Sequence, residues 1–476
     1  MNAVRNIFKN GIVTGITQIF VSASGFLLYI YIARYMGEIE FGKYNFAMSF
    51  ALLFIIFQDL GISNFIIREI ARKKELVDDY LASALEIKFI TSFLVFSIVY
   101  ISINIMKYPQ DTKYVVYLFG IYTILTYFAE TFRSVFQAFE KMEYTAFVTI
   151  IEKAVLLSLV LYVLASGYGL IGIAYAYIFT GFLNVIISCI ICFTKVAKPK
   201  IKINLKLSKL IILGSLPFGL NTLFGMMFFK IDTVMLSIFR DDAAVGIYSA
   251  AYTPLLSLTG IVSTMAISSI YPVMSRYFTE SETSLKNITV LSSKYMAMIG
   301  FPICTGCILL SEEFIELLYI NQYSESVFVF KILALYIPFR FLSSITGTYL
   351  TCINKQKLRT ISVALGSVLN IILNLIMIPM LSHIGAGIAT VLSEVFLFII
   401  FSHYIRKDNK HLELHRQFVK PIIGSFLMGA LIVTLKGTNL YLLVILAFIF
   451  YSLLLMLIGG FTQEDKDVFN QITKGI

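Results

Sequence analysis

The sequence has no tryptophan, only four histidines and few charged residues. Charged side chains make up 14% of its 476 residues, whereas 58% are hydrophobic. No histidine has a neighbouring ligand pattern, which argues against a metal centre. The mean hydropathy of +0.85 is far above that of a soluble globular chain, because a water-soluble core cannot take up so much apolar surface. This composition excludes an ordinary soluble protein and indicates that the lipid bilayer is the solvent.

Cysteine is scarce as well, and its positions do not suggest a reactive site. Two pairs have the C-x-x-C spacing that would indicate a zinc or redox site in a soluble protein. All five cysteines lie in apolar runs, so we expect buried thiols at Cys189, Cys192, Cys304, Cys307 and Cys352.

The chain also lacks the ten-residue stretches of alternating apolar and polar residues that are typical of membrane β-barrels. Its apolar runs are nearly continuous, as in residues 154–164 and 440–457. Most approach the roughly 20 residues that a helix needs to cross a bilayer. The first run is too long for a signal peptide and has no convincing cleavage site before Arg34, so we expect it to remain as the first helix.

We therefore predict an all-α polytopic membrane protein with about fourteen transmembrane helices. The predicted spans are approximately residues 10–33, 41–62, 81–105, 114–137, 145–166, 171–193, 209–231, 244–272, 288–310, 327–352, 360–381, 384–405, 420–436 and 440–460.

Lysine and arginine are distributed very unevenly between alternate predicted loops. One set of loops holds the clusters at residues 68–74, 195–209, 355–359 and 406–420, whereas the other set holds scattered cations. Positive residues near helix ends are retained on the cytoplasmic side, so both termini of this multi-pass protein are predicted to be cytoplasmic. The net charge of +10 follows from this bias and from attraction to membrane lipids, and no nucleic-acid partner is expected.

Two short patterns recur in the two halves of the chain at similar separations. The pattern G-x-Y-x-x-A begins at Gly42 and again at Gly246, and G-I-A begins at Gly172 and again at Gly387. Matching order and similar separation indicate two parallel repeats of six helices each. We predict a first bundle at residues 1–194, a basic cytoplasmic linker at 195–209, a second bundle at 210–406, and helices thirteen and fourteen with a cytoplasmic tail at 407–476.

Several motifs carry a family resemblance in their order and spacing. They are Ala33-Arg34-Tyr35-Met36-Gly37, Phe41-Gly42-x-Tyr44, Asp59-Leu60-Gly61-Ile62-Ser63-Asn64, Arg68-Glu69-Ile70-Ala71-Arg72, Asp232-x-x-Met235-Leu236 and Val245-Gly246-x-Tyr248-x-x-Ala251-Tyr252. Through them the chain resembles the oligosaccharide flippases of the polysaccharide biosynthesis family, which belong to the multidrug/oligosaccharidyl-lipid/polysaccharide exporter superfamily.

The resemblance implies two six-helix bundles facing each other in a V around a central cavity, with alternating inward and outward openings. It also implies a substrate in which an oligosaccharide is linked to a polyprenyl phosphate or diphosphate. We expect a monomer in the cytoplasmic membrane, with glycosyltransferases or a polymerase of the same pathway as further partners. The related lipid II flippases carry arginines in the first helix, and residues 11–33 have none, which argues against a peptidoglycan precursor.

Charged residues embedded in apolar runs are costly and generally face a cavity or a partner, so they are candidates for substrate binding. In the first half these are Lys88, Glu130, Arg133, Glu152 and Lys153, all near the predicted cytoplasmic ends of their helices. We hypothesise that Arg133 and Lys153 receive the phosphate while Glu130 and Glu152 position them. The alternative is salt bridging between helices or snorkelling to the headgroups, and Lys88 fits this alternative better.

In the second half, Arg340 and Glu394 lie about halfway through their predicted spans. They either pair across the bundle, or Arg340 binds the anionic headgroup and Glu394 carries a coupling proton or sodium ion. No other cofactor is expected. Lys230 and Asp232 are predicted near the outer end of helix seven, either as part of an external gate for substrate or as interfacial anchors.

Proline and tyrosine give two further expectations. Prolines interrupt predicted helices of the second half, and helix seven is the predicted hinge because it contains Pro217, Gly219, Asn221 and Gly225. Tyrosines at predicted helix ends are expected to form an interfacial belt. These are Tyr29, Tyr31, Tyr35, Tyr114, Tyr117 and Tyr441.

Two other functions remain open on the sequence. A cation-coupled multidrug exporter of the same superfamily is predicted to have mainly carboxylates in its path, whereas this chain has several embedded cations. A membrane-embedded enzyme of the glycan pathway would need a large loop outside the membrane or a cluster of catalytic carboxylates. The longest predicted loops are short, so we expect no enzyme activity.

Overall fold

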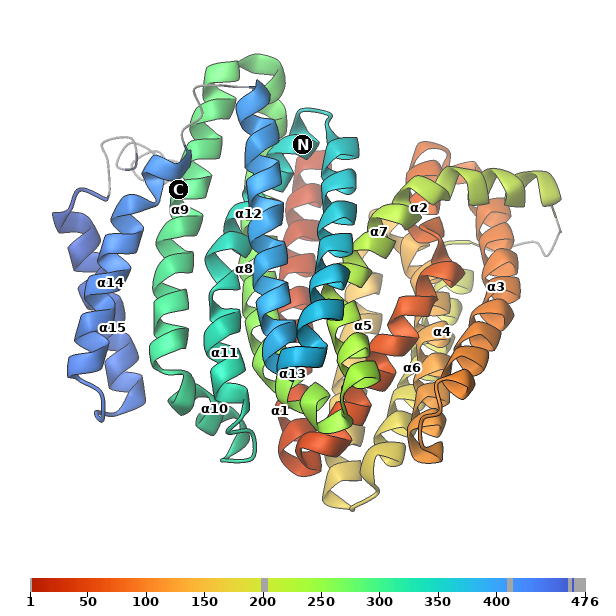
Figure 1. Ribbon diagram of the computed structural model, residues 1–476. Helices are drawn as coiled ribbons and strands as arrows, with labels where there is room; N and C mark the ends of the chain where they lie inside the picture. The colour runs from red at the N-terminus through yellow and green to blue at the C-terminus, as the bar shows by residue number, and fades with distance from the viewer. Residues whose placement is uncertain (1, 198–203, 409–413, 461–464, 466–476) are drawn as a thin grey trace. The chain divides into compact units, whose positions relative to one another are not determined.

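The computed structural model describes residues 2–197, 204–408, 414–460 and 465, and the regular structure within these ranges is entirely helical (Figure 1). Packing divides the chain into two compact units that meet between Ser249 and Ala250. These units are defined by contacts within each of them. The predicted six-helix bundles at residues 1–194 and 210–406 are a different division and remain a prediction. The middle of the predicted basic linker, residues 198–203, lies outside the described residues.

In the part that the structure describes, the first unit contains seven complete α-helices and the start of an eighth. They are α1 (Asn2–Asp59), α2 (Ile62–Arg72), α3 (Val77–Ile105), α4 (Gln110–Ala138), α5 (Met142–Ala165), α6 (Gly169–Lys195), α7 (Leu205–Phe239) and α8 (Asp242–Glu280), with a short 3₁₀ turn at Lys74–Leu76.

The second unit continues from α8. It contains α9 (Glu282–Leu309), α10 (Ser311–Tyr319), α11 (Ser326–Ala334), α12 (Tyr336–Cys352), α13 (Gln356–Asp408), α14 (Val419–Thr434) and α15 (Leu440–Leu457), with a 3₁₀ turn at Leu414–Gln417. In this unit α14 packs against both α9 and α15 (Figure 1).

The helices account for the predicted number of membrane crossings. Eleven described helical segments are long and apolar enough to span a bilayer. Two of them, Lys9–Arg72 and Gln356–Lys407, have 64 and 52 residues, which is enough for two crossings at about 1.5 Å per residue. Each is interrupted by non-helical backbone, at Gly37 (φ 69°) and at Ser382 (φ 54°). With the shorter apolar helix α14, these segments confirm the prediction of an all-α protein with fourteen membrane helices.

The outer faces of α14 and α15 are apolar, as expected for helices that face hydrocarbon. Large side chains on α14 and α15 stand almost fully exposed, including Phe426 (77%), Phe448 (70%) and Leu457 (82%). Contiguous apolar surface of this extent is unfavourable in water. The inner faces of the two helices pack against α9, and the hydroxyl of Tyr451 donates a hydrogen bond to the Met298 carbonyl at 2.9 Å.

The repeated G-x-Y-x-x-A pattern marks a close and reciprocal contact between α1 and the start of α8. A Cβ atom at Gly42 would lie 1.7 Å from the carbonyl oxygen of Asp242. A Cβ atom at Gly246 would lie 2.0 Å from the carbonyl oxygen of Glu38. Each glycine therefore faces the carbonyl that lies four residues before the other glycine, as expected for two copies of one repeat that cross at this point. Only glycine allows the two backbones to approach so closely.

Lys88 pairs with a carboxylate where α1 gives way to α2. The helix is interrupted there at Leu60 and Gly61, both of which have a positive φ angle. Lys88 Nζ lies 2.6 Å from Asp59 Oδ1, and the lysine side chain is fully buried. Lys88 therefore forms a salt bridge between helices and does not extend to the lipid headgroups.

Two predictions about position are corrected by the structure. The seventh span does not end near residue 231, because α7 continues to Phe239. Tyr29 is not part of an interfacial belt, because only 8% of it is exposed and its hydroxyl donates to the Ser249 carbonyl at 2.8 Å.

The predicted hinge and the predicted thiols have different outcomes. Pro217 lies inside the continuous helix α7. The side chain of Asn221 is outside the described residues, and the hinge stays a prediction.

The cysteines are free thiols, four of them buried and Cys189 half-buried, which agrees with their placement in apolar runs.

Candidate functional site

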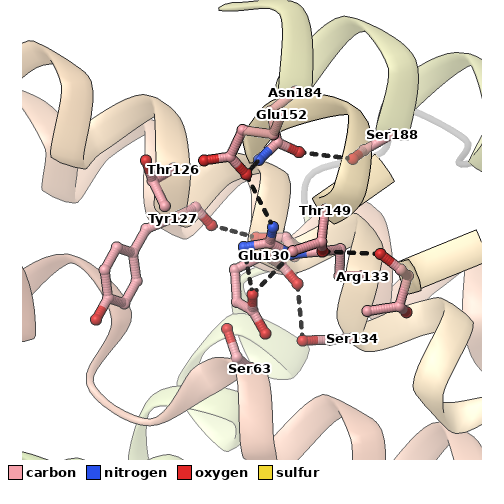
Figure 2. A network of polar contacts seen from close by, with 12 residues as sticks. Ser63, Thr126, Tyr127, Glu130, Arg133, Ser134, Thr149, Glu152, Asn184 and Ser188 are labelled. Carbon is pink, nitrogen blue, oxygen red and sulfur yellow. Dashed lines mark hydrogen bonds and ion pairs between the residues drawn. The ribbon is translucent and has the colours of Figure 1, made fainter. Parts of the chain in front are cut away.

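Four charged residues that the sequence indicated as candidates for substrate binding come together between α4 and α5. Figure 2 shows three of them, Glu130, Arg133 and Glu152. Arg133 Nη2 lies 2.7 Å from Glu130 Oε2, and its Nε donates to the same oxygen at 2.9 Å. Arg133 Nη1 lies 3.6 Å from Glu152 Oε2. Lys153 Nζ donates to Glu152 Oε1 at 3.1 Å. We call these four side chains the charged cluster.

The spacing of the residues explains how the charged cluster forms. Glu130 and Arg133 are three residues apart, so they share one face of α4. Glu152 is on α5, which packs beside α4 in the same unit, and it is 97% buried. A buried carboxylate is stable only with partners, and Asn184 on α6 supplies a further one by donating from its amide to Glu152 Oε2. Ser188 in turn donates to Asn184 Oδ1 at 3.2 Å.

The charged cluster balances its own charge, with two cations and two carboxylates. The guanidinium of Arg133 is directed at both carboxylates, and its side chain is only 11% exposed. An incoming phosphate would have to compete with Glu130 and Glu152 for Arg133. Lys153 is more accessible, with 23% of its side chain exposed.

Lys153 also lines a cavity of about 270 Å³ within the first unit. This cavity, which we call the tyrosine cavity, is bounded by α1, α5 and α6. Its lining residues are Val21, Ser24, Gly25, Leu28, Tyr29, Tyr44, Lys153, Leu156 and Tyr177. The hydroxyl groups of Tyr44 and Tyr177 share a hydrogen bond of 2.7 Å. Ligand sites usually measure about 300–1,000 Å³, so this cavity suits one part of a large headgroup.

The tyrosine cavity contains residues that the sequence did not single out. Tyr44 was part of a repeated motif, and Tyr177 lay within an apolar run, so neither position indicated a ligand. Asn184 was overlooked as well, although an amide within the apolar run of α6 is an unusual residue that needs a hydrogen-bond partner.

The second unit holds the pair that was predicted at mid-membrane. Arg340 on α12 and Glu394 on α13 lie 3.8 Å apart. Glu394 is fully buried, and the Ser343 hydroxyl donates to its Oε1. Arg340 keeps 26% of its side chain exposed. The two residues therefore lie within pairing distance in the second unit, and the transport roles of Arg340 and Glu394 stay predictions.

Lys230 and Asp232 both lie inside α7, and neither is among the residues that line the tyrosine cavity. Asp232 is fully buried and accepts a hydrogen bond from the Tyr248 hydroxyl at 2.9 Å. Lys230 is half-buried. Because α7 extends to Phe239, both lie further from the helix end than predicted. Asp232 is therefore not an interfacial anchor.

Within the described ranges, no three His, Cys, Asp or Glu side chains gather as ligands of a metal ion would. Besides apolar side chains and Gly25, the tyrosine cavity is lined by one ammonium group, three phenols and one hydroxyl. Such a set binds anions and hydrogen-bonding rings.

Several known proteins are similar to this chain in sequence or in fold. The sequence profile of a family described as polysaccharide biosynthesis protein matches residues 7–278. A probable low-salt glycan biosynthesis flippase, Agl15 of Haloferax volcanii, is 23% identical over 439 residues, which cover 91% of each chain. The fold is similar to the lipid II flippase MurJ in an inward closed conformation, with a TM-score of 0.77, 15% identity, and coverage of 95% of this chain and 99% of that one. An inward-facing multidrug transporter gives a TM-score of 0.63 at 14% identity, with coverage of 83% and 99%.

Proposed function

Because this chain belongs to the polysaccharide biosynthesis protein family, we propose that it is a flippase for lipid-linked oligosaccharides. Its substrate is an oligosaccharide carried by a polyprenyl phosphate or diphosphate, and it moves the headgroup across the cytoplasmic membrane by alternating access. The similarity to Agl15 along most of both chains supports this proposal. A multidrug exporter is less well supported, since the fold is more similar to the lipid II flippase than to the multidrug transporter.

The observation that carries the proposal is the position of Lys153 in the tyrosine cavity. An ammonium group attracts the phosphate of a carrier lipid, and phenol rings and hydroxyls suit the flat faces and hydroxyl groups of sugars. A polar headgroup needs such partners because its transfer into hydrocarbon without hydrogen bonds is unfavourable.

The charged cluster supports a specific division of labour. Glu152 holds Lys153 in place and is itself held by Arg133 and Asn184. When a phosphate approaches Lys153, its negative charge competes with Glu152, and Arg133 neutralises the carboxylate that is released. Lys153 is thus the proposed phosphate ligand, while Arg133 and Glu152 hold it in position and Glu130 holds Arg133.

Lys153→Gln tests the proposed ligand. We expect the flipping rate of a polyprenyl diphosphate sugar in proteoliposomes to fall about tenfold, since hydrogen bonds to a charged group contribute about 1.5–3 kcal/mol. Lys357→Gln is the matched control, because this substitution removes the same charge from an exposed position on α13. An unchanged rate for Lys153→Gln would refute the role of Lys153. The proposed function would be refuted if the wild-type protein flips a simple phospholipid but does not flip any lipid-linked sugar.

We further propose that Glu394 carries the coupling ion while Arg340 binds the anionic headgroup. Oε2 of Glu394 has no hydrogen-bond partner among the described residues, which leaves a buried acceptor for a proton or a sodium ion. Collapse of both ion gradients is expected to reduce the flipping rate of the wild-type protein. Glu394→Gln is expected to make the rate insensitive to the gradients. A wild-type rate that does not respond to either ionophore would exclude coupling.

A further inference from the structure

A second polar feature of the first unit lies apart from the charged cluster and the tyrosine cavity. It is an open groove of about 650 Å³ between α2 and the start of α7, which we call the basic groove. Its lining residues are Phe65, Arg68, Glu69, Lys206, Lys209, Leu210, Leu213 and Gly214. It shares no residue with the tyrosine cavity.

The basic groove has an excess of positive charge. Glu69 is its one carboxylate, and it is engaged by Arg68 at 2.8 Å and by Arg72 at 3.4 Å. Within the described ranges, neither Lys206 nor Lys209 takes part in an ion pair, and both are exposed. Two lysine ammonium groups are therefore available for an anion.

Packing between α2 and α7 fixes the shape of the basic groove. The Arg68 guanidinium lies over the rings of Phe65 and Phe218, at 5.1 and 5.4 Å from their centroids. This cation–π contact holds the arginine between the two helices. A Cβ atom at Gly214 would come within 2.2 Å of the Phe65 ring, so α2 and α7 are in direct contact at this position.

The wall on α7 is divided between cations and exposed apolar side chains. Lys206 and Lys209 lie one turn before Leu210 and Leu213 on the same helix face. The two leucines are 51% and 58% exposed. A ligand that matches this wall has an anionic group next to a hydrocarbon part.

We infer that the basic groove binds the phosphate headgroup of an anionic glycerophospholipid, with the start of its acyl chains against Leu210 and Leu213. The lining residues include no neutral hydroxyl or amide side chain that would suit a sugar, unlike the tyrosine cavity with Ser24 and its three tyrosines. The cations belong to the predicted cytoplasmic side, where anionic lipids attract basic segments. The groove is therefore a lipid site and not part of the sugar path, and this inference does not depend on the proposed function.

Binding of phosphatidylglycerol to the purified full-length protein tests this inference. The double variant Lys206→Gln/Lys209→Gln is expected to bind phosphatidylglycerol in phosphatidylcholine nanodiscs about 10- to 30-fold more weakly, from the usual contribution of each basic residue near an anionic surface. The matched control is Lys357→Gln/Lys407→Gln, which removes the same charge from two other exposed positions. Equal losses in both double variants, or no loss in the first, would overturn the inference. Unchanged thermal unfolding midpoints establish that the variants remain folded.

Two further measurements distinguish the source of the anion. Leu210→Ser/Leu213→Ser is expected to weaken phosphatidylglycerol binding, whereas a site for free phosphate would not respond to this change. Displacement of the phospholipid by millimolar inorganic phosphate, or by a polyprenyl diphosphate sugar at equal concentration, would contradict the lipid assignment. Flipping of lipid-linked sugar by the double lysine variant is a separate readout, so failure of this inference and failure of the proposed function can be told apart.

Discussion

Replacing Lys88 with methionine is expected to lower the free energy of unfolding by about 3–5 kcal/mol, the usual effect of removing one partner of a buried ion pair. Lys88 is fully buried and its ammonium has three acceptors: Asp59 Oδ1 at 2.6 Å, Ser63 Oγ at 3.0 Å and the Tyr127 carbonyl at 3.0 Å. Methionine fills a similar volume but leaves the Asp59 carboxylate buried without a cation. The shift is measured by thermal or denaturant unfolding of the purified protein in detergent.

The control for this prediction removes both charges. Lys88→Met combined with Asp59→Asn leaves no buried ion, and the amide oxygen of asparagine can still accept the hydrogen bond from Ser63. We expect the double variant to regain most of the stability that Lys88→Met loses. If the double variant instead loses as much stability as the two single variants together, Lys88 and Asp59 do not stabilise the protein as a pair.

Substitution of Gly42 by alanine is expected to destabilise the protein by at least about 3 kcal/mol, the upper end of the usual cost of overpacking. The new methyl group would lie 1.7 Å from the carbonyl oxygen of Asp242. This atom belongs to the backbone, so no rotation of a side chain can relieve the overlap. The start of α8 must move away from α1, and the unfolding midpoint falls accordingly.

Gly15→Ala is the matched control for Gly42→Ala. Gly15 lies on the same helix, and nothing comes within 4 Å of a Cβ atom placed there. Because alanine has a higher helix propensity than glycine by about 1 kcal/mol, Gly15→Ala is expected to leave stability unchanged or to increase it. Equal tolerance of alanine at Gly42 and Gly15 would mean that α1 and α8 are not in tight contact.

The number of helices could be predicted from the sequence because hydropathy and length reflect the bilayer, which acts on every span alike. The breaks within α1 and α13 were expected on the same basis, since a run of more than 50 residues cannot cross once. The end of α7 was not predictable. Lys230 and Asp232 reduced the hydropathy near residue 231, but Tyr248 satisfies Asp232 and the helix continues.

The candidate site could be predicted only in part. The rarity of charges in apolar runs was enough to identify Arg133, Lys153, Arg340 and Glu394. The direction in which each side chain points depends on neighbours far along the chain, such as Asn184 for Glu152. Sequence therefore did not distinguish Arg133, which is enclosed by carboxylates, from Lys153, which faces a cavity. Tyr29 was misplaced for the same reason, because its partner is the Ser249 carbonyl.

The ion pair between Lys88 and Asp59 also constrains how this chain enters the membrane during synthesis. On its own, α3 would carry a lysine into hydrocarbon, which costs about 2.5–3.5 kcal/mol on insertion scales. The compensating aspartate is on the crossing that leaves the ribosome just before it. The two segments are therefore best inserted together as a helical hairpin. If the earlier segment has already moved away into the bilayer when α3 emerges, α3 inserts less efficiently.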